Sequence, residues 1–387
     1  MDIVIVAGET SGDQLAAHLV EQLLAADSSL RFHGIAGPKM RAAGVNAWFD
    51  QQLLAVRGYG EVLTALPRIL SIKKQLIAKT LALKPALYIG VDAPDFNLRI
   101  ERALKQQRIR TMHYVCPSFW AWRPERAAKF NEAVDHMLCL FPFEPELLAR
   151  HKVPATFVGH PLATARYVNM DRDELRQKLE VSVGGATDPI VAVLPGSRES
   201  ELKFHSELFV ETMKSLGIDF PHARFLVPLA TRETRDIFER TLWAFAPSLA
   251  PRVTLMFGNA DFALRCADVA LVASGTATLE AAMLDCPQVV SYRISALTHF
   301  IVKRKITLPY VSLPNILAKA HIVPELLQKD ASVPALTKAL GDLIREPQLR
   351  EKMQTTYAQI RESLVAPETA TGAASPGVAA VMQLIGP

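Results

Sequence analysis

The chain has 387 residues, of which 50% are hydrophobic and 21% are charged, and its formal net charge is +4. This length favours two domains of roughly 150–200 residues, and so small a charge gives no argument for a nucleic-acid partner. Four cysteines, at positions 116, 139, 266 and 286, lie far apart without a CxxC pair. We therefore expect buried thiols in a reducing compartment, and neither disulfides nor a zinc site.

The chain contains no stretch of roughly 18 uninterrupted apolar residues, the length that a membrane-spanning helix needs. The N-terminal sequence MDIVIVAGETSG lacks a basic region followed by a long apolar run. We expect a first strand there and no targeting segment. The protein is thus expected to be soluble or peripheral to a membrane.

Short apolar runs, typical of buried parallel strands, alternate with helix-length segments along the chain. A first series occupies residues 2–7, 31–37, 85–91, 109–115, 136–141 and 155–160, and a second occupies 189–197, 223–230, 252–257, 269–274 and 288–293. A polar, glycine-containing stretch at 160–188 separates them. The pattern predicts an α/β protein with two Rossmann-like, doubly wound domains, 1–165 and 166–357, facing each other across a cleft.

Two loops of the second domain have the composition of phosphate sites. In VAVLPGSRESEL and VALVASGTATLE, small residues lie between a strand and a helix, where backbone N–H groups suit an anion. An arginine in the first loop adds a guanidinium, and a glutamate in the second can accept the hydroxyls of a ribose. Either loop alone is also explained by an ordinary turn or helix N-cap. The residues concerned are Gly196, Ser197, Arg198, Ser274, Gly275, Thr276 and Glu280.

Two aspartates follow a predicted strand of the first domain. In ALYIGVDAPDFN, Asp92 and Asp95 come directly after the apolar run, where a carboxylate can take a proton from a bound hydroxyl. Their spacing is not that of an Asp-x-Asp metal motif, and no other cluster of histidine or acidic residues in the sequence offers a metal site. Ordinary turn chemistry is the alternative, since aspartate and proline both favour turns.

Aromatic and basic residues share the loop after the next strand. The stretch HYVCPSFWAWRPER contains Trp120, Trp122 and Arg123. Aromatic faces beside arginines suit a sugar ring that bears phosphate. Packing of the tryptophans inside a large loop is an equally good interpretation.

The segment at 56–80 has more apolar residues than a narrow core-facing stripe requires, and it also carries lysines and arginines. An apolar face with basic edges suits a membrane surface with anionic lipid, or the acyl chains of a lipid substrate. A normal helix packed on the sheet is the alternative. A second basic and apolar stretch, 299–318, could belong to the same surface. The apolar residues assigned to the face are Val62, Leu63, Leu66, Ile69 and Leu70.

Together these motifs resemble those of the lipid-A-disaccharide synthases. The resemblance rests on VAGETSGD (6–13), GIAGPKM (34–40), GVDAPDFN (90–97), HYVCPSFWAWR (113–123), LPGSRESE (194–201), ASGTATLE (273–280) and PYVSLPN (309–315). It implies a GT-B glycosyltransferase that needs neither a metal nor another cofactor and inverts the transferred sugar. The substrates would be UDP-2,3-diacylglucosamine and 2,3-diacylglucosamine 1-phosphate (lipid X), and the products a β(1→6) disaccharide and UDP.

The resemblance also implies roles for particular residues. Asp92 is the first choice for the general base and Asp95 the second. Arg198 and the two helix N-termini would stabilise the departing UDP, and Glu280 would hold the ribose. Backbone near 257–258 or 290–293 would contact uracil.

VAGETSGD would then face the acceptor, and it is no dinucleotide loop. Gly8 and Gly12 would permit close approach, Ser11 would cap the following helix, and Glu9 favours sugar hydroxyls over phosphate. The tail at 358–387 would pack on the first domain or on a partner subunit of a homodimer, although Pro376 and Gly377 interrupt it. The resemblance further implies a cytoplasmic protein held peripherally at the inner membrane.

Three other classes of protein share some of these features. Another GT-B transferase or an epimerase that uses a UDP-amino sugar would have the second-domain loops but would not need GVDAPDFN. A non-catalytic protein that binds acylated sugars at a membrane would bind lipid without UDP. An α/β hydrolase is disfavoured, because neither VAGETSGD nor PGSRES forms a Gly-x-Ser-x-Gly elbow.

Overall fold

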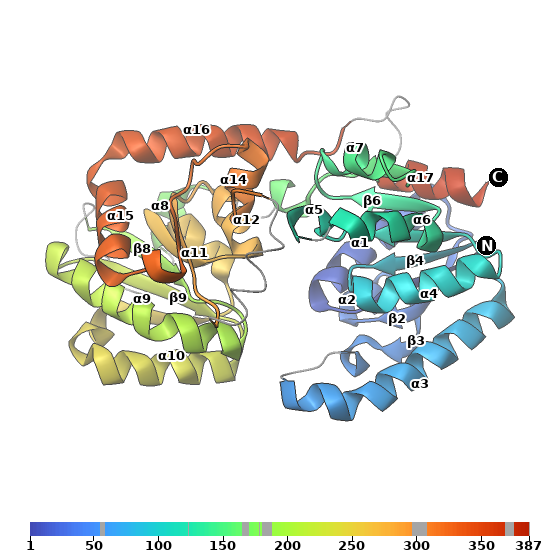
Figure 1. Ribbon diagram of the computed structural model, residues 1–387, viewed down its shortest axis with the longest axis horizontal. Helices are drawn as coiled ribbons and strands as arrows, with labels where there is room; N and C mark the ends of the chain where they lie inside the picture. The colour runs from blue at the N-terminus through green and yellow to red at the C-terminus, as the bar shows by residue number, and fades with distance from the viewer. Residues whose placement is uncertain are drawn as a thin grey trace. The chain divides into compact units, whose positions relative to one another are not determined.

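The structure is a computed structural model, and it describes residues 1–54, 59–122, 124–164, 170–177, 179, 188–295, 308–367 and 375–386. The chain forms two compact units (Figure 1). The first comprises Met1–Pro161 with Leu364–Pro387, and the second comprises Leu162–Ser363. The chain therefore leaves the first unit once and returns to it for its last residues.

The first unit is built on a parallel sheet of seven described strands in the order β3-β2-β1-β4-β5-β6-β7. Its strands are β1 Asp2–Ala7, β2 Arg31–Ala36, β3 Asn46–Asp50, β4 Leu87–Val91, β5 Thr111–Tyr114, β6 His136–Cys139 and β7 Ala155–Phe157. Its helices are α1 Thr10–Ala26, α2 Pro38–Ala42, α3 Tyr59–Leu83, α4 Pro94–Gln106, α5 Phe119–Trp122, α6 Phe130–Ala133, α7 Glu144–Ala149 and α17 Pro376–Ile385.

Both faces of this sheet are covered, which explains why its strands are continuous apolar runs. Ile3 and Ile5 of β1 join one core with residues of α1 and α17, whereas Val4 and Val6 join the opposite core with residues of α3 and α4. Alternate residues of a strand point to opposite faces, so a single strand supplies both cores.

The last helix, α17, completes the first of these cores. Val378 and Val381 are buried there, and the Ser375 hydroxyl accepts a hydrogen bond from the Val378 N–H as an N-cap. Pro376 occupies the first turn, where a missing N–H costs nothing. Pro376 and Gly377 therefore begin a separate helix of ten residues, as expected from their position in the tail. The predicted homodimer stays a prediction.

The second unit is built on a parallel sheet of six described strands in the order β10-β9-β8-β11-β12-β13. Its strands are β8 Ile190–Leu194, β9 Arg224–Leu229, β10 Val253–Phe257, β11 Val269–Ala273, β12 Gln288–Tyr292 and β13 Glu325–Leu327. Its helices are α8 Arg172–Gln177, α9 Glu199–Asp219, α10 Arg232–Phe245, α11 Ala260–Cys266, α12 Thr276–Met283, α14 Leu313–Ala318, α15 Val333–Arg345 and α16 Pro347–Ser363.

In each sheet the order of the strands reverses at one point, the topological switch point. In the first unit β1 lies between β2 and β4, and in the second β8 lies between β9 and β11. Ligands of open parallel sheets bind beyond the carboxyl ends of the strands at such switch points. The loops after β1, β4, β8 and β11 are therefore the places to look for chemistry, and all four carry motifs singled out in the sequence.

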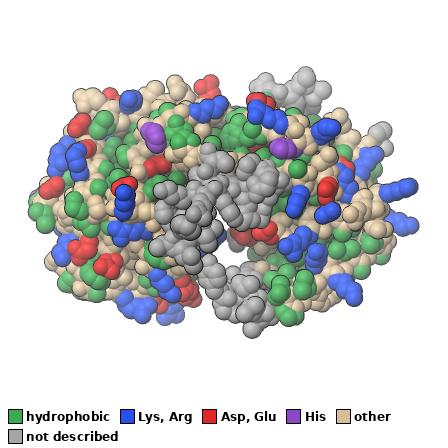
Figure 2. Space-filling view, in the orientation of Figure 1, with side chains coloured by type: hydrophobic (Ala, Val, Ile, Leu, Met, Phe, Trp, Pro, Cys, Tyr) green, Lys and Arg blue, Asp and Glu red, His purple; other side chains and the backbone are tan. Residues whose placement is uncertain are grey.

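The helix predicted at 56–80 exists as α3, and its two halves differ. Ile72 and Leu76 are buried against the sheet, but Leu66 and Leu70 are 46% and 52% exposed. Ile69 is half-buried, and Arg68 and Lys74 are exposed. Figure 2 shows hydrophobic and basic side chains next to one another over the described part of this helix. The C-terminal half is thus an ordinary core helix, whereas the preceding turns present an apolar surface.

Candidate active site

The loop after β4 holds Asp92 in a strained backbone conformation. Asp92 and Ala93 are consecutive non-glycine residues with φ of 54° and 44°, in the left-handed region. Each such residue costs of order 1–3 kcal/mol and persists only where the surroundings enforce it, most often at functional sites. The Asp92 N–H donates to the Tyr114 carbonyl at 2.8 Å, which extends the ladder to β5. The strain singles out Asp92 from Asp95, which lies in the first turn of α4 and is exposed.

The turn after β1 packs directly on this Asp92 turn. A Cβ at Gly8 would lie 2.6 Å from the Ala93 Cβ, so no side chain fits there. Gly12 lies farther off, since a Cβ there would be 3.4 Å from the Val91 carbonyl oxygen. The backbone at Gly8 therefore packs against Ala93 and helps to support the Asp92 turn.

Helix α1 begins at Thr10 with Glu9 as N-cap residue and without a capping side chain, so the expectation that Ser11 caps the helix was wrong. Glu9 and Ser11 are both exposed at this turn. Their predicted contact with the acceptor stays a prediction.

Asp13 has a structural role that the sequence did not reveal. Its buried carboxylate accepts hydrogen bonds from the backbone N–H groups of Gly37, Lys39 and Met40, at 2.9–3.1 Å. These groups begin α2, where a negative charge is favourable. Asp13 thus ties VAGETSGD to GIAGPKM through hydrogen bonds to residues that lie 24 to 27 positions further along the chain.

Of the aromatic residues predicted for the acceptor, Trp120 is buried. Its side chain is 8% exposed, its Nε1 donates to Glu144 Oε1 at 3.1 Å, and it packs edge-on against Phe141 and Phe143. Trp120 is therefore a buried packing residue, and its ring is not exposed as a platform for a sugar. The Trp122 side chain and Arg123 lie outside the described residues.

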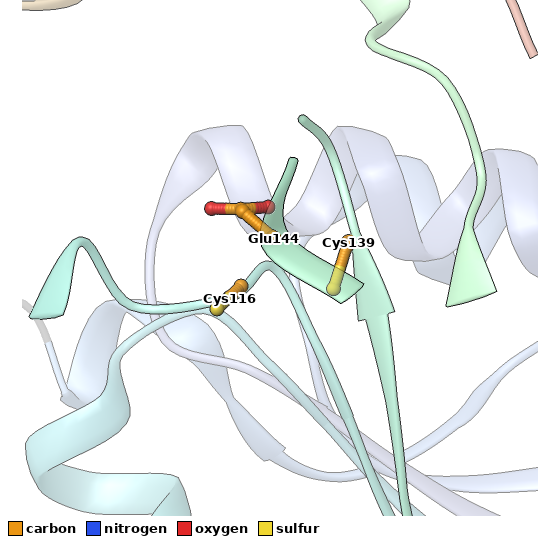
Figure 3. A group of neighbouring side chains, drawn as sticks. All are labelled: Cys116, Cys139 and Glu144. Atoms are coloured by element: carbon orange, nitrogen blue, oxygen red, sulfur yellow. The ribbon is translucent and has the colours of Figure 1, made fainter. Parts of the chain in front are cut away.

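Glu144 belongs to a buried group with Cys116 and Cys139, in which one potential ligand atom from each residue lies within 4.8 Å of the others (Figure 3). Burial raises the pKa of the Glu144 carboxyl to about 8, and the Cys139 thiol together with burial raises the pKa of Cys116. At neutral pH the Glu144 carboxyl and the Cys116 thiol are therefore protonated. Because Glu144 also accepts from the Phe141 N–H, we assign the group a structural role.

The raised pKa predicts a stability that falls as the pH rises. The folded protein keeps the Glu144 proton up to about pH 8, whereas the unfolded chain releases it near 4.5. Between these values the stabilisation from the protonated form is lost at up to about 1.4 kcal/mol per pH unit. Glu144→Gln cannot ionise, so its unfolding free energy should fall less than that of the wild type between pH 6 and 8.

Urea unfolding at several pH values measures this difference. Glu146→Gln is the control, because Glu146 lies on the same helix and its side chain is 78% exposed. Parallel pH profiles for wild type and Glu144→Gln would contradict the assignment of a buried, neutral Glu144.

The second unit contains a cavity of about 440 Å³ beyond the carboxyl ends of β8 and β11. All seven residues predicted from the two phosphate-type loops line it: Gly196, Ser197, Arg198, Ser274, Gly275, Thr276 and Glu280. Sequence reasoning missed further lining residues, namely Glu201, Pro228, Leu229, Ala230 and Ala260. Of the two stretches named for uracil, Gly258 lines the cavity, whereas 290–293 are not among its described lining residues.

The two loops offer different groups to an anion. The Ser197 and Arg198 N–H groups donate to Glu201 Oε2 at 2.8 and 3.3 Å, so the expectation of a free N–H group at Ser197 was wrong. Helix α12, in contrast, begins after Gly275 without a capping side chain. At Gly275 the φ of +136° excludes most side chains, and a Cβ would meet no atom within 4 Å. The open helix N-terminus of α12 and the exposed Arg198 are thus the groups available to a phosphate.

Glu280 lies one turn into α12, on the wall of the same cavity. Burial, and after it the Asp261 carboxylate, raises the pKa of Glu280 above its usual value. A carboxylate in this position is a strong acceptor for hydroxyl groups while it is ionised.

Comparison with known proteins decides which family this arrangement belongs to. A family model described as lipid-A-disaccharide synthetase matches residues 3–373. A lipid-A-disaccharide synthase of Chromobacterium violaceum is 47% identical over 97% of this chain and 96% of its own length. The chain belongs to the lipid-A-disaccharide synthetase family. It is accordingly a glycosyltransferase of lipid A biosynthesis, and the resemblance seen in the motifs is confirmed.

Solved structures with little sequence identity share the fold. A UDP-GlcNAc 2-epimerase from Neisseria meningitidis, bound to UDP-GlcNAc, has a TM-score of 0.62 at 14% identity and covers 94% of this chain and 99% of its own. A transferase from Siraitia grosvenorii in complex with UDP has a TM-score of 0.62 at 12% identity and covers 99% of both chains. The GT-B architecture predicted from the sequence is therefore confirmed.

Proposed function

We propose that this chain transfers 2,3-diacylglucosamine from its UDP derivative to 2,3-diacylglucosamine 1-phosphate, with Asp92 as the general base. The acceptor C6 oxygen forms a bond to the anomeric carbon from the face opposite to UDP, and the bond from that carbon to the UDP oxygen breaks. The hydroxyl proton passes to the Asp92 carboxylate, and UDP leaves with the electron pair. The strained, half-exposed Asp92 at the switch point of the first sheet carries this proposal.

Residues of the second unit stabilise the leaving group. Negative charge develops on the UDP oxygen in the transition state, and fixed positive groups directed at it lower the barrier. Arg198 and the uncapped N-terminus of α12 line the same cavity and are suited to this task. We assign the diphosphate to these groups and the ribose to Glu280.

The product's anomeric configuration tests the reaction. Inverting transfer turns the α-linked sugar of the donor into a β-linked sugar, joined to O6 of the acceptor. We expect NMR of the isolated disaccharide 1-phosphate to give a β(1→6) linkage and no α anomer. An α-linked product would contradict a single displacement assisted by Asp92.

The role of Glu280 predicts how UDP binding depends on pH. Because its pKa is raised, Glu280 becomes protonated at a higher pH than an ordinary glutamate, and ribose then loses a charged acceptor. We expect Glu280→Gln to weaken UDP binding about tenfold at pH 7.5, and to lose less affinity than the wild type as the pH is lowered.

Calorimetric titration with UDP at each pH measures both effects. Protonation of the UDP phosphate, whose pKa is about 6, affects both proteins equally, so the difference between them isolates Glu280. Equal affinities at every pH would remove Glu280 from the nucleotide site.

We also propose that the exposed turn of α3 contacts lipid, either the membrane surface or substrate acyl chains. In the described residues no helix is long and apolar enough to cross a membrane. Leu66 and Leu70 expose about half of their side chains next to Arg68 and Lys74, a combination suited to anionic lipid. The side chains of Val62 and Leu63, assigned to the same face, lie outside the described residues, as do residues 299–307 of the second basic stretch.

Replacing both exposed leucines by serine should reduce binding to vesicles. Burial of one leucine contributes about 1.5–3 kcal/mol, so Leu66→Ser with Leu70→Ser should lower partitioning into anionic vesicles at least tenfold, measured by co-sedimentation. Ile218→Ser is the control, because Ile218 is 76% exposed on α9 of the other unit. Unchanged partitioning of the double variant would contradict the lipid contact.

A further inference from the structure

A buried asparagine lies beneath the strained Asp92 turn. Asn97, in the first turns of α4, has no exposed surface, and neither has Tyr88 of β4. Burying an amide costs free energy unless its hydrogen bonds are satisfied. The contacts of Asn97 therefore explain why this position is polar.

The asparagine amide joins the ends of two strands and the turn that follows one of them. Its Nδ2 donates to the carbonyl oxygen of Asp92 at 2.9 Å and lies 3.3 Å and 3.4 Å from those of Val91 and Val6. Buried carbonyl groups need a hydrogen-bond donor. One side chain thus supplies hydrogen bonds to the ends of both β1 and β4 and to the Asp92 turn itself.

Tyr88 determines which way the amide faces. Its hydroxyl donates to Asn97 Oδ1 at 3.2 Å, which leaves the NH₂ group directed at the carbonyl oxygens. Gly90 makes room for this layer, because a Cβ there would lie 2.8 Å from the Asn97 Cβ and 2.2 Å from Glu101 Oε1. The layer is therefore closely packed, and the amide has little freedom to rotate.

We propose that Asn97 is a positioning residue for the transfer reaction: its amide holds the left-handed Asp92–Ala93 turn against the ends of β1 and β4, so that the Asp92 carboxylate keeps one orientation toward the acceptor hydroxyl. This inference rests on the proposed role of Asp92. A small displacement of a catalytic group can cost about 10²-fold in rate, and two consecutive left-handed residues would relax once the amide is removed.

Asn97→Asp tests the proposal with little change in size. The aspartate keeps an acceptor for Tyr88 and loses the NH₂ donor. We expect kcat to fall about 10- to 100-fold, with the KM for the lipid acceptor and the Kd for UDP changed less than threefold. Tyr88→Phe, which removes the group that orients the amide, should lower kcat by a smaller factor in the same pattern.

The control is Thr111→Val. Thr111 is the first residue of β5, and its buried hydroxyl donates to the Ala133 carbonyl oxygen. The substitution should lower the unfolding temperature and leave kcat unchanged. Unchanged kcat in both Asn97→Asp and Tyr88→Phe, or an equal loss in Thr111→Val, would overturn the positioning role.

The pH profile of kcat separates this inference from the role of Asp92. In Asn97→Asp the acidic limb should persist at a lower plateau, because the base is still present, whereas in Asp92→Asn it should disappear. A nearly wild-type kcat in Asp92→Asn would refute Asp92 as the base, and the positioning role with it. A large loss in Asp92→Asn beside a wild-type Asn97→Asp would refute the positioning role alone.

Discussion

Replacing Asp92 by asparagine is expected to lower kcat by about 10²–10⁴-fold, the contribution typical of a positioned general base. Asparagine has nearly the same shape and tolerates the left-handed conformation that position 92 requires. The turn should therefore stay intact, and UDP binding, assigned to the other unit, should be unchanged. Steady-state kinetics with both lipid substrates and a UDP titration measure the two effects.

Asp95→Asn is the matched control for this experiment. Asp95 lies three residues further along, in the first turn of α4, and its backbone is helical. We expect its kcat to stay within a few-fold of the wild-type value. A large loss in Asp95→Asn with a nearly wild-type Asp92→Asn would transfer the base to Asp95, the second candidate from the sequence.

Replacing Arg198 by alanine is expected to lower kcat by about 10²-fold, because loss of one group that stabilises developing charge typically costs 10²–10³-fold. The neighbouring N–H groups of Ser197 and Arg198 cannot compensate, since Glu201 already occupies them. UDP affinity should also fall, because the guanidinium is the exposed positive group at the end of β8. Kinetics and UDP titration at constant ionic strength give both values.

Arg240→Ala is the control, since Arg240 is an exposed arginine of α10 in the same unit and is not among the cavity's described lining residues. It removes the same charge at a distance from the cavity, so its kinetics should match the wild type. If Arg198→Ala also behaved like the wild type, Arg198 would be a surface residue, and α12 alone would have to stabilise UDP.

The fold could be predicted because each of its layers leaves a local signature. Strands covered on both faces, such as β1 and β8, must be apolar at nearly every position, and residues 2–7 and 190–194 are. The same reasoning identified the loops after β4, β8 and β11, since polar and small residues interrupt the pattern directly at the strand ends. The cavity of the second unit followed from these loops, and all seven residues assigned to the two phosphate-type loops line it.

Contacts between distant parts of the chain could not be predicted in this way. Asp13 and Gly37 lie 24 residues apart, and no local sequence pattern predicts that the Asp13 carboxylate accepts a hydrogen bond from the Gly37 N–H. For Trp120 a sugar platform and buried packing were equally good interpretations, and only the hydrogen bond to Glu144, also 24 residues away, shows that the side chain is buried. In each case the partner comes from another loop at the same end of the sheet.

Two local errors have a different origin. Glu201 follows the PGSR motif by three residues, and a glutamate at the third helical position commonly reaches back to the helix start. That signal was present in the sequence and would have excluded free N–H groups at Ser197. The cap expected at Ser11 is misplaced by two residues, because α1 begins at Thr10 with Glu9 as its N-cap residue.

The most direct test of this account is UDP release from UDP-2,3-diacylglucosamine by the full chain, measured with and without 2,3-diacylglucosamine 1-phosphate and in the presence of EDTA. We predict release that requires the acceptor, is unaffected by EDTA and is lost in Asp92→Asn. Release without the acceptor, or no release with both lipids present despite measurable UDP binding, would contradict it.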